Sequence, residues 1–134
     1  MRFDVITLFP ELFAPFLTVG VTRRAYESGQ VQVQFSNPRD HAVGNYRRID
    51  DRPFGGGPGM VMMGEPLAQA LAHIRTQRVD AAPVVLFSPI GKRLDHAAVQ
   101  RWSDSSRAIL VCGRYEGIDQ RFINAHVDEQ ISLG

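Results

Sequence analysis

The residues best suited to chemistry stand together in one short loop, Gly113 to Gly117. The loop carries a cation, an aromatic ring and a carboxylate, on Arg114, Tyr115 and Glu116. The apolar run Ile109 to Cys112 precedes it and has the pattern of a strand buried on both faces of a sheet. Open α/β sheets bind ligands in the loops beyond the carboxyl ends of such strands. The loop is therefore a candidate ligand site, although a plain strand-to-helix turn would have the same composition.

A second candidate is the glycine-rich stretch Asp50 to Met60, which reads DDRPFGGGPGM. It can turn tightly and offers bare backbone N–H and C=O groups. The Lys-Ser/Thr pair that follows the glycines of a P-loop is missing, so the stretch is no P-loop. Its backbone groups still suit a flat polar base, and a flexible linker is the alternative. Asp50 and Asp51 are adjacent, and an extended chain points them apart. They are better placed to brace the loop arginines than to act as an acid/base pair.

This stretch ends a long segment, residues 37 to 59, that shows no hydrophobic periodicity and resembles a functional or mobile loop. It holds four arginines with two aromatic residues interleaved: Arg39, Tyr46, Arg47, Arg48, Arg52 and Phe54. Single-stranded RNA surfaces use cations for phosphate and rings for stacking. The net charge of only +1 does not by itself indicate a nucleic-acid partner, so a solvated loop remains the alternative.

Composition narrows the class of protein. The 134 residues suffice for one compact domain with a core, and no apolar run is long enough to span a membrane. The N-terminus has no signal-peptide pattern, and Cys112 is the single cysteine, so we expect a cytoplasmic protein. Cys112 ends an apolar strand and fits a small core residue better than a nucleophile. The four histidines lack metal-ligand spacing, and no metal-binding cluster is expected.

Strands and helices are expected to alternate along the chain. We expect strands over residues 3–9, 31–35, 83–87, 107–112 and 127–132, and helices over 11–17, 21–28, 65–76, 95–102 and 118–125. This order predicts an α/β fold with a mainly parallel sheet and helices on both faces. Three strand ends carry glycine-containing loops, which would meet at one edge of the sheet. Their convergence indicates a small-molecule site.

The glycine-rich stretch, together with the later stretch Leu110 to Asp119 (LVCGRYEGID), closely resembles the bacterial tRNA (guanine-N1)-methyltransferases of the knotted methyltransferase superfamily. The resemblance runs from Arg2 to Gly134. It implies a trefoil-knotted fold, a homodimer, and methyl transfer from S-adenosylmethionine to N1 of the guanosine immediately 3′ of a tRNA anticodon. It leaves a role for Mg²⁺ open.

The resemblance also implies residue roles. The cofactor would be held by Ser88, Pro89, Gly91, Gly113, Tyr115, Glu116, Gly117, Ile131, Ser132, Leu133 and Gly134. Glu116 would lie near the cationic end of the cofactor, and Leu133 near its adenine. The target guanine would meet a loop made of Asp50, Arg52, Gly57, Pro58, Gly59 and Met60.

The family's chain continues beyond the position of Gly134. We therefore expect residues 1–134 to be a single S-adenosylmethionine-binding domain truncated at its C-terminal end, with an incomplete knot. The general base would lie beyond Gly134, and the fragment would be inactive alone. One alternative is a non-catalytic RNA-binding module that uses residues 39–54. Another nucleotide-binding α/β enzyme is disfavoured, because phosphate-loop and dinucleotide fingerprints are absent.

Overall fold

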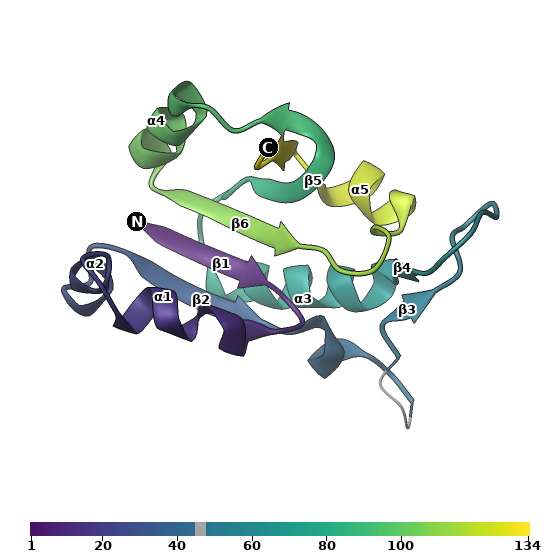
Figure 1. Cartoon of the computed structure of the whole chain (residues 1–134). Helices are drawn as coiled ribbons and strands as arrows, with labels where there is room; N and C mark the ends of the chain where they lie inside the picture. Colours follow the sequence, from purple (N-terminus) through teal and green to yellow (C-terminus); the bar gives the residue numbers. More distant parts are fainter. Residues whose placement is uncertain (45–47) are drawn as a thin grey trace.

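The chain forms a five-stranded parallel sheet with a small ribbon at one end (Figure 1). The computed structural model describes residues 1–44 and 48–134. The sheet strands are β1 (Arg2–Ile6), β2 (Gln32–Ser36), β5 (Val84–Arg93), β6 (Arg107–Cys112) and β7 (Glu129–Ser132), in the order β2-β1-β6-β5-β7. The antiparallel ribbon joins β3 (Asp50–Asp51) to β4 (Val61–Met62). Because the five sheet strands are parallel, their carboxyl ends share one edge.

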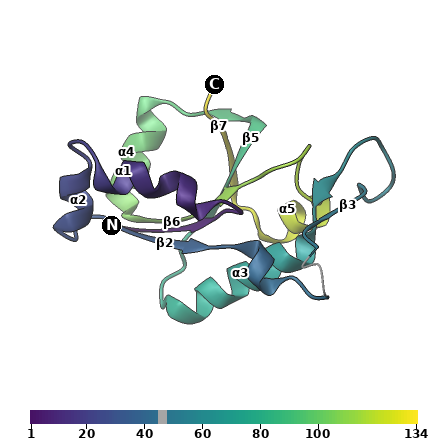
Figure 2. The same cartoon turned by 60° about the horizontal axis from the view of Figure 1, so that its bottom comes forward.

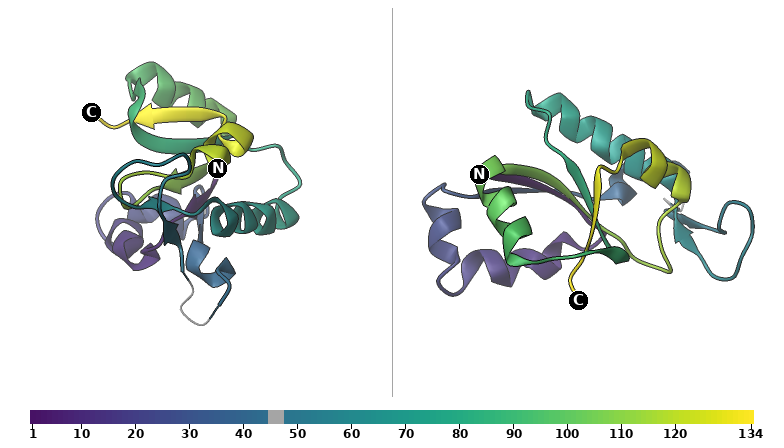
Figure 3. Two further views of the ribbon diagram at one scale, coloured as in Figure 1. Left: turned by 90° about the vertical axis from the view of Figure 1, so that its right-hand side faces the viewer. Right: turned by 90° about the horizontal axis from the view of Figure 1, so that it is seen from above.

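Helices cover both faces of the sheet, as predicted. They are η1 (Pro10–Phe13), α1 (Ala14–Thr18), α2 (Arg23–Glu27), η2 (Pro38–His41), α3 (Gly64–Gln77), α4 (His96–Ser105) and α5 (Gln120–His126). Helices α3 and α5 lie on one face, and α1, α2 and α4 on the other (Figures 2 and 3). The glycine-rich loop between β3 and β4 projects away from the sheet (Figure 1).

Each face of the sheet has its own apolar core. Alternate side chains of β6 divide between them: Ile109 packs on the α3 side and Ala108 on the α4 side. Helix α3 buries one face, including Leu67 and Ile74, as its spacing predicts. On the other side, the rings of Phe87 and Trp102 meet edge to face, with centroids 6.4 Å apart.

Local signals placed the last helices correctly. The Asp95 carboxylate accepts a hydrogen bond from the Ala98 N–H at 2.8 Å and caps α4. Asp119 does the same for α5, accepting from the Arg121 N–H at 2.9 Å. Strand β6 has the predicted bounds.

Two expectations were wrong. Ser88 to Gly91 is not a loop after a strand, because β5 continues to Arg93 and pairs with β7 on both sides of a register shift. A side chain at Gly91 would put its Cβ 2.6 Å from backbone atoms of Gln130 and Ile131, so glycine permits this close passage. The segment 37–59 also contains η2 and β3, whose partner β4 lies outside the segment.

A buried ion cluster ties the end of α3 to the sheet. Arg78 donates to Asp4 at 2.8 Å and to both carboxylate oxygens of Asp80 at 2.8 Å. The side chains of Arg78 and Asp4 are each only 2% exposed. The hydrogen bond with Asp80 raises the pKa of Arg78, and the same contact lowers the pKa of Asp80. The cluster joins β1 to the connection between α3 and β5.

Candidate functional site

The two sequence motifs are bonded to one another. The Glu116 N–H donates to the Met60 carbonyl at 3.1 Å, and the Met62 N–H donates to the Gly117 carbonyl at 2.9 Å. The Asp119 N–H then donates to the Met62 carbonyl at 3.0 Å, and Met62 and Ile118 form a parallel bridge. The loop after β6 and the end of the glycine-rich stretch therefore form one structural unit.

The loop geometry depends on unusual backbone conformations. Tyr115 has φ 59° and Gly117 φ 153°, which brings the chain back towards β4. Gly59 has φ +83°, and the Glu116 carboxylate occupies the space that a Cβ at Gly59 would need. The backbone at position 59 therefore favours glycine, and any side chain there would have to displace the flexible Glu116 carboxylate.

A cavity of about 460 Å³ adjoins this unit at the carboxyl edge of β5 and β6. Leu86, Ile118 and Ile123 give it an apolar wall. Gln130 is also a lining residue, and its buried amide oxygen has no hydrogen-bond partner among the described residues. Glu116 also lines the cavity, and its carboxylate lies against Gly59. The cavity therefore combines an apolar wall with acceptors for N–H, O–H or cationic groups.

The structure brings together part of the predicted cofactor set. The lining includes Ser88, Pro89, Gly113, Tyr115, Glu116 and Gly117. The remaining members, Gly91, Ile131, Ser132, Leu133 and Gly134, lie outside that lining. Ile131 is fully buried in the core on the α4 side, and the Leu133 side chain is 72% exposed. The role of these residues in cofactor binding stays a prediction.

The predicted guanine loop projects into solvent beside the cavity. Gly57, Pro58 and Gly59 are exposed, and Met60 is half-buried. Asp50 lies in β3 opposite Met62.

Arg48 is braced at the base of this loop, as the adjacent aspartates suggested. It donates to the Asp50 carbonyl at 2.7 Å and forms an ion pair with Asp51 at 3.0 Å. Tyr46 and Arg47 of the predicted RNA surface lie outside the described residues.

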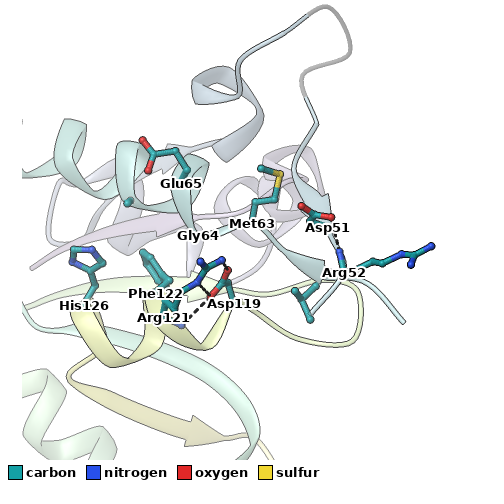
Figure 4. A pocket seen from close by; sticks show the side chains of 11 residues that line it. Asp51, Arg52, Met63, Gly64, Glu65, Asp119, Arg121, Phe122 and His126 are labelled. Carbon is teal, nitrogen blue, oxygen red and sulfur yellow. Dashed lines mark hydrogen bonds and ion pairs between the residues drawn. The ribbon is translucent and has the colours of Figure 1, made fainter. Parts of the chain in front are cut away.

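A second cavity, of about 360 Å³, lies between the ribbon, the start of α3 and α5 (Figure 4). Arg121 lines it and donates to the Asp119 carboxylate at 3.0 and 2.6 Å. These hydrogen bonds lower the pKa of Asp119 and raise that of Arg121. The Arg121 guanidinium also lies 4.3 Å from the ring centroid of Phe54. Sequence reasoning missed Arg121; Asp119, a residue type typical of helix N-caps, is the signal that could have placed Arg121 in the first turn of a helix.

Cys112 and the metal-ligating residue types are further candidates for functional groups. Burial raises the pKa of the Cys112 thiol, which fits a packed side chain. Within residues 1–44 and 48–134, no three His, Cys, Asp or Glu side chains gather as a metal would require. No helix in the same described ranges is long and apolar enough to cross a bilayer.

The fold and the main cavity define an α/β protein with a cavity at the carboxyl edge of a parallel sheet, the edge where open α/β sheets bind ligands. Residues 1–134 match the family described as tRNA (guanine-1)-methyltransferase TrmD, and the chain belongs to this family.

Similar proteins agree with this assignment. The chain is 75% identical to the tRNA (guanine-N(1)-)-methyltransferase of Albidiferax ferrireducens and covers 54% of it. It is 56% identical to the protein of the same name from Stenotrophomonas maltophilia K279a and covers 53% of it. In both cases the whole of this chain is covered. The chain therefore spans about half the length of these curated relatives.

A solved structure supports the fold. The crystal structure of tRNA (m1G37) methyltransferase from Aquifex aeolicus matches with a TM-score of 0.86 and 34% sequence identity. The match covers 100% of this chain and 60% of that one. The α/β architecture predicted from the sequence is thus confirmed, whereas the trefoil knot stays a prediction.

Proposed function

We propose that this chain forms the cofactor domain of a methyltransferase that modifies N1 of the guanosine immediately 3′ of a tRNA anticodon. The observation that carries the proposal is the bonding of Met60 and Met62 to Glu116, Gly117 and Asp119. It places the proposed guanine loop beside the proposed cofactor cavity in one chain. Family membership and the names of the relatives support the reaction.

The main cavity suits S-adenosylmethionine, which would supply a methyl group bound to a sulfonium. Leu86, Ile118 and Ile123 offer an apolar surface for adenine. Glu116 offers a carboxylate to the cationic end, and Gly113 and Gly117 leave room for the ligand to lie against the backbone.

The acceptor must lose a proton as the methyl group arrives. Guanine N1 carries a hydrogen, so the reaction breaks the sulfur–methyl bond, forms the N1–methyl bond and transfers the N1 proton to a base. Gly57 to Met60 would receive the guanine, while Arg52 and Asp50 support the loop. We assign the base to no residue of this chain and expect it in the part of the enzyme beyond Gly134.

Three further properties belong to the proposal: tRNA as partner, a homodimer, and a cytoplasmic location. A dimer is supported by large apolar side chains exposed between η1 and α2, namely Leu12, Phe16, Val19 and Val21. Contiguous exposed apolar side chains commonly mark interfaces. Light scattering of the full-length protein at micromolar concentration would test the dimer, and a monomer would contradict it. A requirement for Mg²⁺ stays open.

Two measurements on the full-length protein test the function. Calorimetric titration with S-adenosylmethionine should show binding, and transfer of labelled methyl to a tRNA transcript should stop when its target guanosine is replaced by adenosine. A protein that binds tRNA but no S-adenosylmethionine would instead be the RNA-binding module. In that case Arg48→Ala would weaken tRNA binding and lower its salt dependence.

A further inference from the structure

An exposed aromatic ring stands at the base of the glycine-rich loop. Phe54 is 72% exposed, yet its ring is held by the guanidinium of Arg121, 4.3 Å from the ring centroid. Arg121 belongs to α5, which follows Phe54 by more than sixty residues in the sequence. A cation–π contact at an exposed site is a modest attraction, so it favours this position of the ring before any ligand arrives.

Arg121 is itself held in place. Two of its nitrogens donate to the Asp119 carboxylate, and Asp119 is only 8% exposed and caps α5. Figure 4 shows Arg121 and Asp119 together at the cavity wall. The Phe54 ring is thereby tied to a helix end, while its exposed fraction leaves most of its surface free. We call Phe54 and Arg121 the Phe54 platform.

Arg52, two residues before Phe54, supplies an exposed cation beside the platform. The carboxylates of Asp51 and Asp119 are paired, with Arg48 and Arg121. The Arg52 side chain is exposed and points away from the cavity (Figure 4). Two further acids lie near the loop: Glu65 accepts a hydrogen bond from Gln69 at 2.9 Å on α3, and the Glu116 carboxylate lies against Gly59.

The surroundings of Phe54 suit a nucleotide better than a protein. From residue 52 to residue 59 the chain reads RPFGGGPG, so Phe54 is the one large apolar side chain in this stretch. A protein partner would be expected to bury a cluster of apolar side chains. An unpaired nucleotide needs only one ring to stack on and one cation for its phosphate.

We propose that the Phe54 platform binds the unpaired RNA nucleotide next to the target guanosine, with its base stacked on Phe54 and its phosphate near Arg52. Phe54 immediately precedes Gly55, and the proposed guanine loop begins at Gly57, so neighbouring chain positions would meet neighbouring nucleotides. Arg121 acts as a positioning residue for the ring. The inference rests on the proposed function of the guanine loop.

The test is a double-mutant cycle in the full-length protein with an anticodon stem-loop RNA. Stacking of one base predicts that Phe54→Leu raises the Kd roughly 5- to 100-fold, whereas Phe54→Tyr keeps it near wild type. The same variants are measured with RNAs that carry an abasic ribose immediately 5′ or immediately 3′ of the guanosine. With the RNA that lacks the base stacked on Phe54, Phe54→Leu should cause no further loss of binding affinity. Equal losses on all three RNAs would overturn the proposal.

Arg121 and the proposed function are tested separately. Arg121→Ala should weaken RNA binding less than Phe54→Leu, and Arg121→Lys should restore part of the loss. Arg101→Ala is the matched control, because Arg101 is 58% exposed and paired with Glu129 on the opposite face. Calorimetry with S-adenosylmethionine should be unchanged in every variant. Failure of the wild-type protein to bind S-adenosylmethionine would reject the proposed function. If the effects of Phe54→Leu and of removing a base are additive for both abasic RNAs, only the platform is rejected.

Discussion

The Glu116 carboxylate lies against the α-carbon of Gly59, in the space that a side chain at position 59 would fill. Glu116 lines the main cavity, and Gly59 belongs to the loop that projects beside it. A single side chain therefore contacts the proposed sites of both substrates. Any side chain introduced at position 59 must displace Glu116 before it reaches the substrate.

Gly59→Ala should therefore weaken S-adenosylmethionine binding as well as stability. Alanine at φ +83° costs about 1–3 kcal/mol of unfolding free energy, and its Cβ moves the carboxylate that we assign to the cationic end of the cofactor. Calorimetry and urea denaturation measure the two effects. Gly29→Ala is the control, because Gly29 has φ +79° and nothing within 4 Å, so only stability should fall. In a Glu116→Ala background, Gly59→Ala should no longer change the affinity for S-adenosylmethionine. If Gly59→Ala lowers that affinity equally with and without the Glu116 side chain, the contact between the two residues is contradicted.

The larger substitution Gly59→Val should abolish methyl transfer. A β-branched side chain strongly disfavours positive φ and would stand where the guanine must approach. Single-turnover rates at saturating S-adenosylmethionine are the measurement, since they bypass any loss of cofactor affinity. A wild-type rate would remove Gly59 from the guanine site.

Gly91→Ala should lower the unfolding free energy by about 1–3 kcal/mol, the usual cost of overpacking. The new Cβ would lie 2.6 Å from the backbone of Gln130 and Ile131, so β5 and β7 must separate. Urea denaturation measures the loss. Gly64→Ala in α3 is the matched control. The new Cβ would lie 3.5 Å from the Phe122 Cβ, an ordinary contact, so the unfolding free energy should stay unchanged or rise slightly. Equal stabilities of the two variants would show that β5 does not pass β7 this closely.

Asp4→Ala should cost about 3–5 kcal/mol, because it leaves part of the buried Arg78 guanidinium without its partner. Thermal and chemical denaturation should both detect the change, with little dependence on salt. The comparison is Glu27→Ala, which removes an exposed ion pair with Arg23 and should change stability by less than about 1 kcal/mol. A similar small effect at both positions would argue against the buried cluster.

Asp119 should make stability depend on pH in the acidic range. Hydrogen bonds from Arg121 hold the pKa of Asp119 below its usual value, so the charged form is favoured in the folded state. Its contribution is present above the unfolded pKa of about 4 and is lost as the pH falls through the lower folded value. The stability difference between wild type and Asp119→Asn should therefore be constant at neutral pH and shrink below about pH 4. The exposed Asp104→Asn serves as control, and parallel curves for all three proteins would contradict the assignment.

Local patterns predicted most of the sheet and helices. The apolar run that forms β6 is bounded by polar residues and Gly113, so its limits could be read directly, and Asp95 marked the start of α4. Ser88 to Gly91 looked like a turn because Ser, Pro and Gly are turn residues. Pairing with β7, some forty residues later in the chain, decided otherwise. Short-range signals could not contain that information.

In the candidate site, too, local sequence patterns predicted the loops but not the long-range contacts between them. The glycine motifs identified both loops, but not the hydrogen bonds that join Met62 to Gly117 and Asp119. Arg121 does not stand out in the sequence, where it is one of many arginines. Its contact with Phe54 depends on the packing of α5 beside the ribbon, which no spacing in the chain reveals.

The strand order also determines when the sheet can form during synthesis. β1 pairs with β2 on one side and with β6 on the other, and these partners begin at Gln32 and Arg107. A chain leaving the ribosome can complete the first pairing early, but the second edge of β1 stays open until residue 107 has emerged. Pairing over such a separation is slow, and an unpaired edge is a template for association with other chains. Newly made protein would thus be most prone to aggregate between these two events.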